Sequence, residues 1–345
     1  MTTTRRKFLG QLGATTAGLS LGPLLPQSLF SMPRNNAFSF EISLAEFSFA
    51  SELYTGKMTN MEFPSRAKEV HDINVLEYVS GFFNGKHTDT KYMQELKQRC
   101  DDLGIINHLI MVDGPDLTSI DDKKRDLAVE SHYEWVDAAK YLGCSSIRVN
   151  LGDPMAALLG TGKEGTPEQS AEAAVDGYGK LLDYASKVNM NVIVENHFGN
   201  STDADWLVGI MKQLKQQNKG LLPDFGNFCV ERTIAESMDF KDLINTKCIK
   251  ELDKYEGVSK MMPYVKGISA KTHRFDDNGY DMETDFFKMF EIIKNSGWTG
   301  GYVGVEYEGG LMRDMGGDLN FLSNDDGVRA TKLLLEEVLE KLGSR

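Results

Sequence analysis

Cysteines, basic residues and long hydrophobic runs are all scarce in this sequence, and each shortage argues against a class of protein. The four cysteines among 345 residues form no Cys-x-x-Cys pair. Their spacing carries no zinc-ribbon or redox signature and does not by itself predict a disulfide. Lys and Arg number 38 against 51 Asp and Glu, which gives a formal net charge of -13. A nucleic-acid partner is not expected, because binding one needs clustered basic residues.

The first 31 residues contain no acidic side chain and begin with a basic cluster. Arg5 and Arg6 precede Phe8 and Leu9, and a mildly apolar stretch rich in Gly and Thr follows. A basic region followed by a weakly hydrophobic one is typical of a signal peptide. The Arg-Arg-x-Phe-Leu core resembles the twin-arginine (Tat) export signal. The sequence therefore predicts a Tat-type signal peptide over residues 1–31, with a disordered basic tail as the alternative.

This segment implies an exported protein without a permanent membrane anchor. Its resemblance to Tat signals implies the Tat export machinery as a partner and a periplasmic or otherwise exported location. No clean Ala-x-Ala site follows, so cleavage is expected somewhere in residues 31–37. Pro23 and Pro26 break the apolar stretch, which argues against a membrane span. No lipobox cysteine offers a lipid anchor.

After this segment, short β-rich runs alternate with stretches of helical periodicity. The eight predicted strands are Phe38–Leu44, Asn74–Ser80, Ile106–Val112, Ser145–Leu151, Asn191–His197, Gly220–Gly226, Val265–Thr272 and Gly301–Glu308. The predicted helices are 88–103, 122–142, 168–189, 203–217, 284–296 and 326–342.

This alternation predicts an α/β fold with right-handed βαβ units and a parallel sheet. Eight units over residues 38–343 fit a single (β/α)8 TIM-barrel domain. A doubly wound sheet is the rival fold, but no Gly-rich phosphate loop follows the strands. The loop 152–167 and the long connection 228–264 are candidate lids over the barrel mouth.

Three predicted strands carry a carboxylate directly after an apolar run. Glu195 follows Val-Ile-Val, Asp224 follows Leu-Leu-Pro, and Glu306 follows Val-Gly-Val. Such a carboxylate must lie near water or be paired, because uncompensated burial is costly. Barrel enzymes place their sites at the carboxyl ends of the strands. We therefore expect the three to converge there and to hold a divalent metal. The alternative is that one or two of them cap the following helix or pair with Arg or Lys.

An oxygen-rich site of this kind suits Mn²⁺ first, then Mg²⁺, with Co²⁺ and Zn²⁺ as further options. At this point the residues resemble a family. The motifs that carry the resemblance are ENH at 195–197, LPDFGNF at 222–228 and GVEYEG at 304–309. They are similar to the xylose isomerase-like TIM barrels, and more narrowly to exported bacterial proteins labelled sugar phosphate isomerase/epimerase. In that family Glu, Asp, His and Glu bind the metal, which implies Glu195, Asp224 and Glu306 as three of the ligands.

The fourth ligand position departs from the family pattern. Family members commonly carry His-x-Lys-Asp on strand seven, whereas this chain reads Ser-Ala-Lys-Thr-His at 269–273. A serine hydroxyl is a poor ligand. With Ser269 in this position, either His197, His273 or water completes the metal shell, or metal binding is weaker.

Several polar side chains at the ends of the strands are candidate substrate contacts. His197 lies two residues after Glu195 and so points to the same side of the strand. Lys271 matches the family's lysine, which implies that it polarises a carbonyl or holds a hydroxyl; an ion pair at the barrel rim is the alternative. The predicted contacts are His197, Lys271, His273, Arg148 and His108.

The resemblance implies a metal-dependent sugar isomerase or epimerase with a small carbohydrate as substrate. Glu195 and Glu306 are then the catalytic pair: one removes the proton next to a carbonyl of a keto-sugar, and the other returns it on the opposite face. The same first step serves β-elimination, so a lyase or glycoside-cleaving enzyme on 3-keto-sugars is the first alternative. A non-catalytic sugar-binding barrel is the second. An endonuclease IV-like phosphodiesterase is disfavoured, because it needs a richer His and Glu cluster and a basic groove. Many barrels of this family form homo-oligomers, but no stretch of this sequence identifies an interface.

Overall fold

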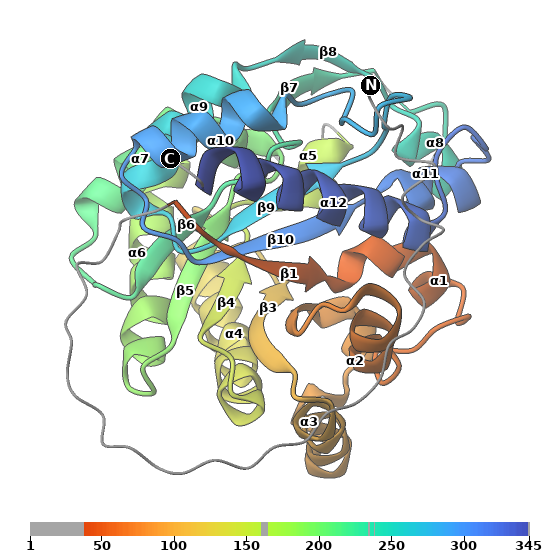
Figure 1. Cartoon of the computed structure of the whole chain (residues 1–345). Helices are drawn as coiled ribbons and strands as arrows, with labels where there is room; N and C mark the ends of the chain where they lie inside the picture. Colours follow the sequence, from red (N-terminus) through yellow and green to blue (C-terminus); the bar gives the residue numbers. More distant parts are fainter. Residues whose placement is uncertain (1–37, 160–164, 234, 238, 344–345) are drawn as a thin grey trace, which may run out of the picture. The chain divides into compact units, whose positions relative to one another are not determined.

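The computed structural model describes the chain from residue 38 onward. The described ranges are 38–159, 165–233, 235–237 and 239–343. The predicted signal peptide, residues 1–31, and its cleavage region lie outside them. The described part consists of parallel strands that alternate with helices (Figure 1).

Eight parallel strands form the central sheet. In sheet order they are β6 Lys219–Leu222, β5 Asn191–Glu195, β4 Ser146–Val149, β3 Ile106–Val112, β2 Val75–Val79, β1 Glu41–Ala45, β10 Tyr302–Tyr307 and β9 Ile268–Thr272. The two edge strands meet through parallel bridges that join Leu221 to Val265 and Asp224 to Ser269. The N–H of Ser269 donates to the carbonyl of Pro223 at 3.0 Å. These contacts complete a (β/α)8 TIM barrel, so the predicted fold is confirmed.

The long helices surround the barrel, and shorter helices lie within the connections between strands and helices. The long ones are α3 Thr90–Leu103, α4 Asp122–Leu142, α6 Pro167–Ser186, α7 Ala204–Gln213, α9 Lys254–Met261, α10 Phe286–Asn295 and α12 Asn324–Gly343. The short α-helices are α1 Ala50–Tyr54, α2 Phe63–Ser65, α5 Pro154–Leu158, α8 Phe240–Ile244 and α11 Gly309–Asp314. The remaining turns are η2 Glu46–Phe49, η3 Arg66–Val70, η4 Ser80–Phe83, η5 Lys86–Thr88, η6 Gly199–Thr202 and η7 Met262–Tyr264.

Local sequence signals explain where several helices begin. Thr166 caps α6 in a capping box with Gln169, as Thr-Pro-Glu at this point predicts. Asp121 caps α4 by accepting hydrogen bonds from the N–H groups of Lys123 and Lys124. All six predicted helices are present, with ends shifted by a few residues.

Residues of each strand alternate between two apolar layers. On β5, Val192 and Val194 belong to the core between barrel and helices, whereas Ile193 packs in a cluster inside the barrel. This period of two makes Glu195 the next inward position after Ile193. The same alternation on β10 places Glu306 inside. The alternation therefore points Glu195 and Glu306 into the barrel, and their positions near the ends of β5 and β10 place them at its carboxyl end.

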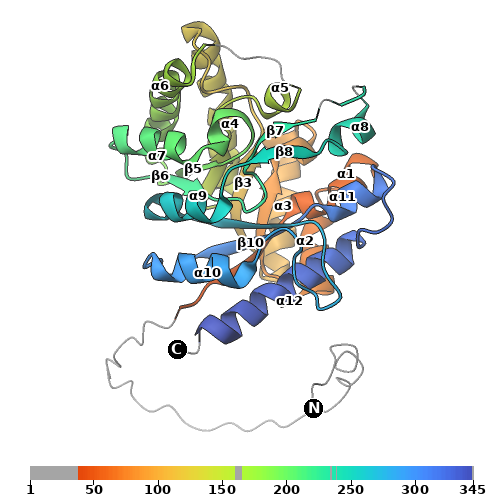
Figure 2. The same ribbon diagram turned by 90° about the horizontal axis from the view of Figure 1, so that it is seen from above.

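The connection 228–264, a predicted lid, contains a two-stranded antiparallel sheet. Strand β7 (Cys229–Arg232) pairs with β8 (Cys248–Glu251), and a disulfide joins Cys229 to Cys248 across a Cα–Cα distance of 5.8 Å. Both ribbon views place this hairpin near α5 and α8 (Figures 1 and 2). The other predicted lid, 152–167, contains α5, and its residues 160–164 lie outside the described ranges.

Removing the disulfide should lower the stability of the protein. The two cysteines are 19 residues apart, and closing a loop of that length stabilises a fold by about 3 kcal/mol. We expect the double variant Cys229→Ala/Cys248→Ala to lose about this much free energy of unfolding in a urea titration. Dithiothreitol should destabilise the wild type and leave the variant unchanged. An equal effect of the reductant on both proteins would contradict a stabilising disulfide.

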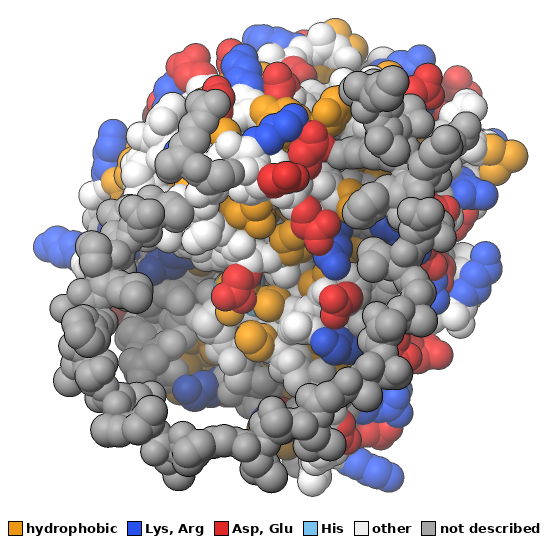
Figure 3. All heavy atoms as spheres, viewed as in Figure 1, with side chains coloured by type: hydrophobic (Ala, Val, Ile, Leu, Met, Phe, Trp, Pro, Cys, Tyr) orange, Lys and Arg blue, Asp and Glu red, His pale blue; other side chains and the backbone are white. Residues whose placement is uncertain are grey.

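Among the described residues, no helix is long and apolar enough to cross a membrane. Figure 3 shows one face of the molecule, on which acidic and basic side chains are interspersed.

Candidate active site

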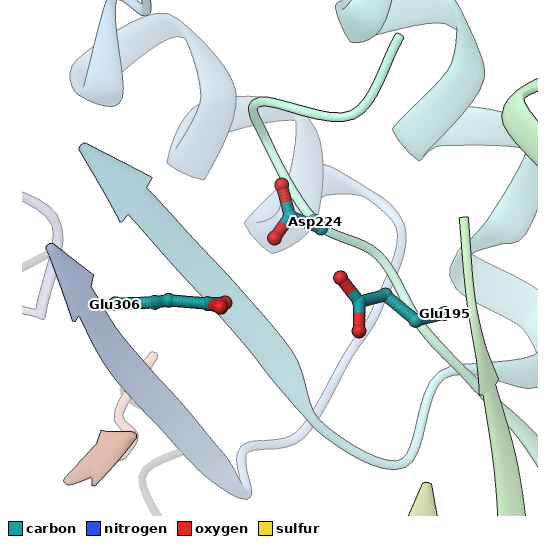
Figure 4. Close-up of side chains that lie close together, drawn as sticks. All are labelled: Glu195, Asp224 and Glu306. Carbon is teal, nitrogen blue, oxygen red and sulfur yellow. The ribbon is translucent and has the colours of Figure 1, made fainter. Parts of the chain in front are cut away.

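Three acidic side chains converge at the carboxyl end of the barrel. Glu195 is the last residue of β5, Asp224 follows β6, and Glu306 lies in β10. One carboxylate oxygen from each lies within 4.8 Å of the others, and all three residues are buried. Figure 4 shows the three side chains pointing toward one another, with Glu306 on a strand and Asp224 on a loop. The structure therefore brings together the three predicted metal ligands.

Ser269 lies between two of these carboxylates. Its Oγ is 3.0 Å from Oδ2 of Asp224 and 2.5 Å from Oε2 of Glu306. A hydroxyl has one proton, so it donates to one carboxylate at a time. The Asp224–Ser269 bridge that closes the barrel explains this position, because it sets the two residues side by side. Ser269 thus points into the predicted metal site, where the family pattern places a histidine.

Two buried cations offset the charge of the three carboxylates. Lys271 Nζ lies 3.0 Å from Oδ2 of Asp224 and 2.9 Å from Oε1 of Glu308. Arg148 Nε lies 2.8 Å from Oε2 of Glu195. Lys271 therefore lies in the cluster as the ion-pair partner of Asp224 and Glu308, and its predicted contact with the substrate stays a prediction.

Burial is the main influence on the protonation of the three clustered carboxyls. It raises the pKa of Glu195 to about 7, of Asp224 to about 6 and of Glu306 to about 7. Lys271 opposes this rise at Asp224 and Glu306, and Arg148 opposes it at Glu195. Carboxyls of this kind lose their protons readily to a cation placed between them. The oxygen-only donor set and its burial fit a hard divalent cation.

Mn²⁺ should stabilise the protein more at about pH 8 than at about pH 5. The ligand carboxyls have pKa values of about 6 to 7 when folded, above the ordinary values of 3.8 and 4.5. Without metal, the stability that these protonated carboxyls contribute is therefore lost as the pH rises through 6 to 7. The cation competes with the same protons, so it binds more tightly once the carboxyls are deprotonated. The measurement is the Mn²⁺-induced rise in melting temperature across this range. Asp224→Asn should abolish the rise, and a rise that shrinks with increasing pH would contradict the prediction.

Arg148 links Glu195, a predicted metal ligand, to a second polar group. Its Nη1 donates to Oδ1 of Asp113 at 2.7 Å and to Oδ1 of Asn150 at 3.2 Å. The Arg148 side chain is only 5% exposed, so its guanidinium orients Glu195 and Asp113. Arg148 therefore pairs with two carboxylates, and its predicted contact with the substrate stays a prediction. His197 adjoins this group through Nδ1, which lies 3.1 Å from Oδ1 of Asn150.

Both nitrogens of His273 are engaged with carboxylates. Nδ1 lies 3.0 Å from Oε2 of Glu283, and Nε2 lies 3.4 Å from Oε2 of Glu308. Burial lowers the pKa of His273, but Glu283 and Glu308 outweigh burial and raise this pKa to about 10. A protonated imidazole has no lone pair for a metal. Within the described ranges, the group that converges closely enough to hold a cation is the three carboxylates, without His197 or His273.

The structure places His108 at the opposite end of the barrel from the three carboxylates. Its Nδ1 lies 3.0 Å from Oγ of Ser145, and its ring lies 4.3 Å from the ring of Tyr302. Ser145 precedes β4 and Tyr302 begins β10, so these neighbours mark the amino ends of the strands. The predicted substrate contact at His108 is therefore not supported, because an apolar run fixes the face of a residue but not its level along the barrel.

Other residues of the site were not predicted from the sequence. Asn227 donates to Oε1 of Glu195 at 2.9 Å and accepts from Lys271 at 3.3 Å. Asn196 accepts from the N–H of Asp224 at 2.7 Å. Asp113 follows Ile-Met-Val, the same signal of an acid after an apolar run that pointed to the three predicted ligands. Applying that rule to the third strand would have found it.

The fold and the site define a (β/α)8 barrel with a buried cluster of three acids at its mouth that could hold a cation. The model of the xylose isomerase-like TIM barrel family matches residues 70–329. The chain therefore belongs to this family, and the predicted resemblance is confirmed. Among curated protein sequences, none matches the chain.

Solved structures with the same fold include a sugar epimerase and two metal-bound proteins. An L-ribulose 3-epimerase is 14% identical, with a TM-score of 0.61 and coverage of 88% of this chain and 96% of that one. The IOLI protein with a bound zinc atom is 13% identical, with a TM-score of 0.62 and coverage of 89% and 100%. A xylose isomerase-like TIM barrel protein from Mycobacterium smegmatis, in complex with magnesium, is 13% identical, with a TM-score of 0.60 and coverage of 88% and 98%. At these identities the likeness establishes the fold.

Proposed function

We propose that this protein is a metal-dependent sugar isomerase or epimerase that acts on a keto-sugar by moving the proton next to its carbonyl. The observation that carries the proposal is the convergence of Glu195, Asp224 and Glu306 at the barrel mouth of a xylose isomerase-like protein. The L-ribulose 3-epimerase and the metal-bound structures of the same fold support it.

The three carboxylates would hold the metal, for which Mn²⁺ is our first candidate. When bound, a divalent cation supplies Lewis acidity to the carbonyl and hydroxyl oxygens of a sugar. Glu195, Asp224 and Glu306 offer carboxylate oxygens, the donors that Mn²⁺ and Mg²⁺ accept, whereas Zn²⁺ usually takes nitrogen or sulfur ligands as well. With Ser269 in the fourth position, the site favours the harder cations.

Glu195 and Glu306 are proposed to carry the proton. They approach from β5 and β10, two strands that are not neighbours in the sheet. Their pKa values of about 7 suit groups that take up and release protons at neutral pH. One carboxylate accepts the carbon-bound proton, and the other returns a proton on the opposite face or at the adjacent carbon. Arg148 and Asn227 hold Glu195 in place, and Ser269 holds Glu306.

The test is incubation of the protein and Mn²⁺ with L-ribulose, D-tagatose or D-fructose in heavy water. We expect a new ketose or aldose by chromatography and one deuterium on the carbon next to the carbonyl by mass spectrometry. Glu306→Gln should give neither. Absence of both product and deuterium across a wide panel of neutral and phosphorylated ketoses would overturn the proposal.

A lyase that cleaves 3-keto-glycosides is the second candidate. The Cys229–Cys248 disulfide favours it, because disulfides persist in oxidising compartments outside the cytoplasm, where glycosides arrive unphosphorylated. Proton removal next to the 3-keto group is again the first step, followed by loss of the aglycone. Release of nitrophenol from a nitrophenyl 3-keto-glucoside without formation of an epimer would replace the epimerase proposal with this one.

The disulfide and the Arg-Arg-x-Phe-Leu segment also support export through the Tat pathway as a proposal. Arg5→Lys/Arg6→Lys should retain the protein in the cytoplasm of a Tat-competent bacterium, whereas the native sequence should appear outside it with a new N-terminus. Export of the double variant at the native level would contradict this route.

A further inference from the structure

The side-chain amide of Asn150 has one possible orientation in this site. Its Nδ2 donates to Oδ1 of Asp113 at 3.0 Å, and its Oδ1 accepts from Nη1 of Arg148 at 3.2 Å. A carboxylate only accepts, and a guanidinium only donates. Turning the amide over would oppose two donors on one side and two acceptors on the other. The oxygen of Asn150 therefore faces Arg148.

This orientation determines which nitrogen of His197 carries a proton. Nδ1 of His197 lies 3.1 Å from Oδ1 of Asn150, an oxygen that can only accept. Nδ1 must therefore be the N–H, which leaves Nε2 of the neutral ring with its lone pair. Asn150 is itself buried, and both its amide oxygen and its amide nitrogen are hydrogen-bonded, so it cannot rotate to accommodate the other tautomer of His197.

A guanidinium already lies beside this ring. The Oδ1 atom of Asn150 that faces Nδ1 of His197 at 3.1 Å also accepts from Nη1 of Arg148 at 3.2 Å, so a second positive charge on the imidazole would face the first across one oxygen. The ring therefore offers an acceptor at Nε2 and no second donor.

The backbone around His197 is also fixed. Its N–H donates to Oγ of Ser201 at 3.0 Å, and the next residue, Phe198, has a φ of 55° and a ψ of 166°. A non-glycine residue rarely adopts such a conformation, and strained positions of this kind cluster at binding sites. The half-buried imidazole is thus held at the mouth, beside the three carboxylates.

We propose that His197 is a specificity-determining hydrogen-bond acceptor for one hydroxyl of the sugar, and that Asn150, fixed by Arg148 and Asp113, is the positioning residue that sets its tautomer. The identity of the ligand as a sugar rests on the proposed function; the tautomer does not. The charged donors Arg148 and Lys271 already pair with carboxylates. Nε2 of the neutral His197 ring can only accept a hydrogen bond, so it favours a substrate group that donates one and disfavours a group that only accepts.

The substrate class follows from this polarity. A hydroxyl can donate to Nε2, whereas an ether, a glycosidic oxygen or a phosphate ester oxygen at the same position presents a second lone pair. A site built to bind a hydroxyl discriminates strongly against analogues that leave its polar group unpaired. We expect the sugar to carry a free hydroxyl at this position, so that its O-methyl and deoxy analogues bind at least about tenfold more weakly.

The tautomer is tested without any substrate, by long-range ¹H–¹⁵N correlation spectra of the full chain labelled with ¹⁵N-histidine. The signals of His197 are identified by their loss in His197→Asn. We expect the proton on Nδ1 in the wild type and a growing Nε2–H population in Asn150→Ala. A proton on Nε2 in the wild type, or an unchanged spectrum in Asn150→Ala, would overturn the inference.

The role in recognition is tested with a matched pair of variants. The amide of Asn overlays Nδ1 and lacks the distal acceptor, whereas the amide of Gln reaches the position of Nε2. With Mn²⁺ and the ketose that the wild type binds best, His197→Asn should raise the KM about tenfold with a smaller change in kcat, and His197→Gln should restore it. Equal losses in both variants, or no loss in either, would overturn the role.

Monodeoxy ketoses then locate the hydroxyl. On the one analogue that lacks the hydroxyl bound by His197, wild type and His197→Asn should bind with equal affinity. If the variant weakens the parent ketose and every deoxy analogue by the same factor, no hydroxyl is read by His197 and the proposal fails. A wild type that binds no ketose would remove the proposed function and the hydroxyl role together, and the spectra would still decide the tautomer.

Discussion

Glu306→Gln should lower kcat/KM for the preferred keto-sugar by about 10³-fold and abolish deuterium exchange next to its carbonyl. The Glu306 side chain is buried in β10, and burial is the main reason that its pKa is raised to about 7. An amide of the same shape keeps the packing and can still accept a hydrogen bond from Ser269. It cannot accept the carbon-bound proton or supply a charged ligand, so both functions of this residue are lost.

The matched control is Glu95→Gln, which removes a charge on the exposed surface of α3, where Glu95 pairs with Arg99. This variant should keep the wild-type kcat/KM, because surface ion pairs contribute little. Circular dichroism and the melting temperature establish that Glu306→Gln is folded. If folded Glu306→Gln retains deuterium exchange at more than about a tenth of the wild-type rate, Glu306 is not one of the catalytic pair.

Ser269→His should strengthen metal binding on the order of tenfold and shift the preference toward Zn²⁺. Ser269 is bridged to Asp224 at the closure of the barrel, and its Oγ contacts both Asp224 and Glu306. A side chain at this position therefore points at the proposed cation site. An imidazole there would add the nitrogen ligand that the family pattern contains and that Zn²⁺ prefers.

Ser269→Ala is the matched control for this substitution, because it removes the hydroxyl without adding a ligand. Calorimetric titrations with Mn²⁺ and Zn²⁺ should show no gain in affinity for Ser269→Ala. They should show a larger gain for Zn²⁺ than for Mn²⁺ in Ser269→His. A folded Ser269→His variant with wild-type affinities for both ions would mean that the side chain at position 269 does not enter the metal shell.

The barrel could be predicted because its signals are local and repeated. Eight apolar runs that alternate with amphipathic helices predict a parallel sheet, in which the carboxyl ends of all the strands lie at the same end of the barrel. Glu195, Asp224 and Glu306 could be predicted for the same reason, since an acid that ends an apolar run cannot stay unpaired inside a barrel. The closing bridge between Asp224 and Ser269 then places the unusual serine directly among the proposed ligands.

The remaining features depend on distances that a periodic pattern does not contain. His108 lies near the amino end of β3, whereas Asp113 directly follows the carboxyl end of that strand. The register shift between β2 and β3 cannot be seen in the sequence. The pairing of Cys229 with Cys248 requires the hairpin that brings them together. The hydrogen-bond chain from Asp113 to His197 joins the ends of three strands, and no spacing along the chain encodes it.

The central claim is that Glu195, Asp224 and Glu306 together hold one divalent cation, and calorimetric titration of the metal-stripped protein with Mn²⁺ tests it most directly. We expect one site per chain in the wild type and none in Asp224→Asn, a variant that preserves the shape of the side chain and removes its charge. Absence of Mn²⁺, Mg²⁺, Co²⁺ and Zn²⁺ binding in the wild type, or binding that survives intact in Asp224→Asn, would contradict the account.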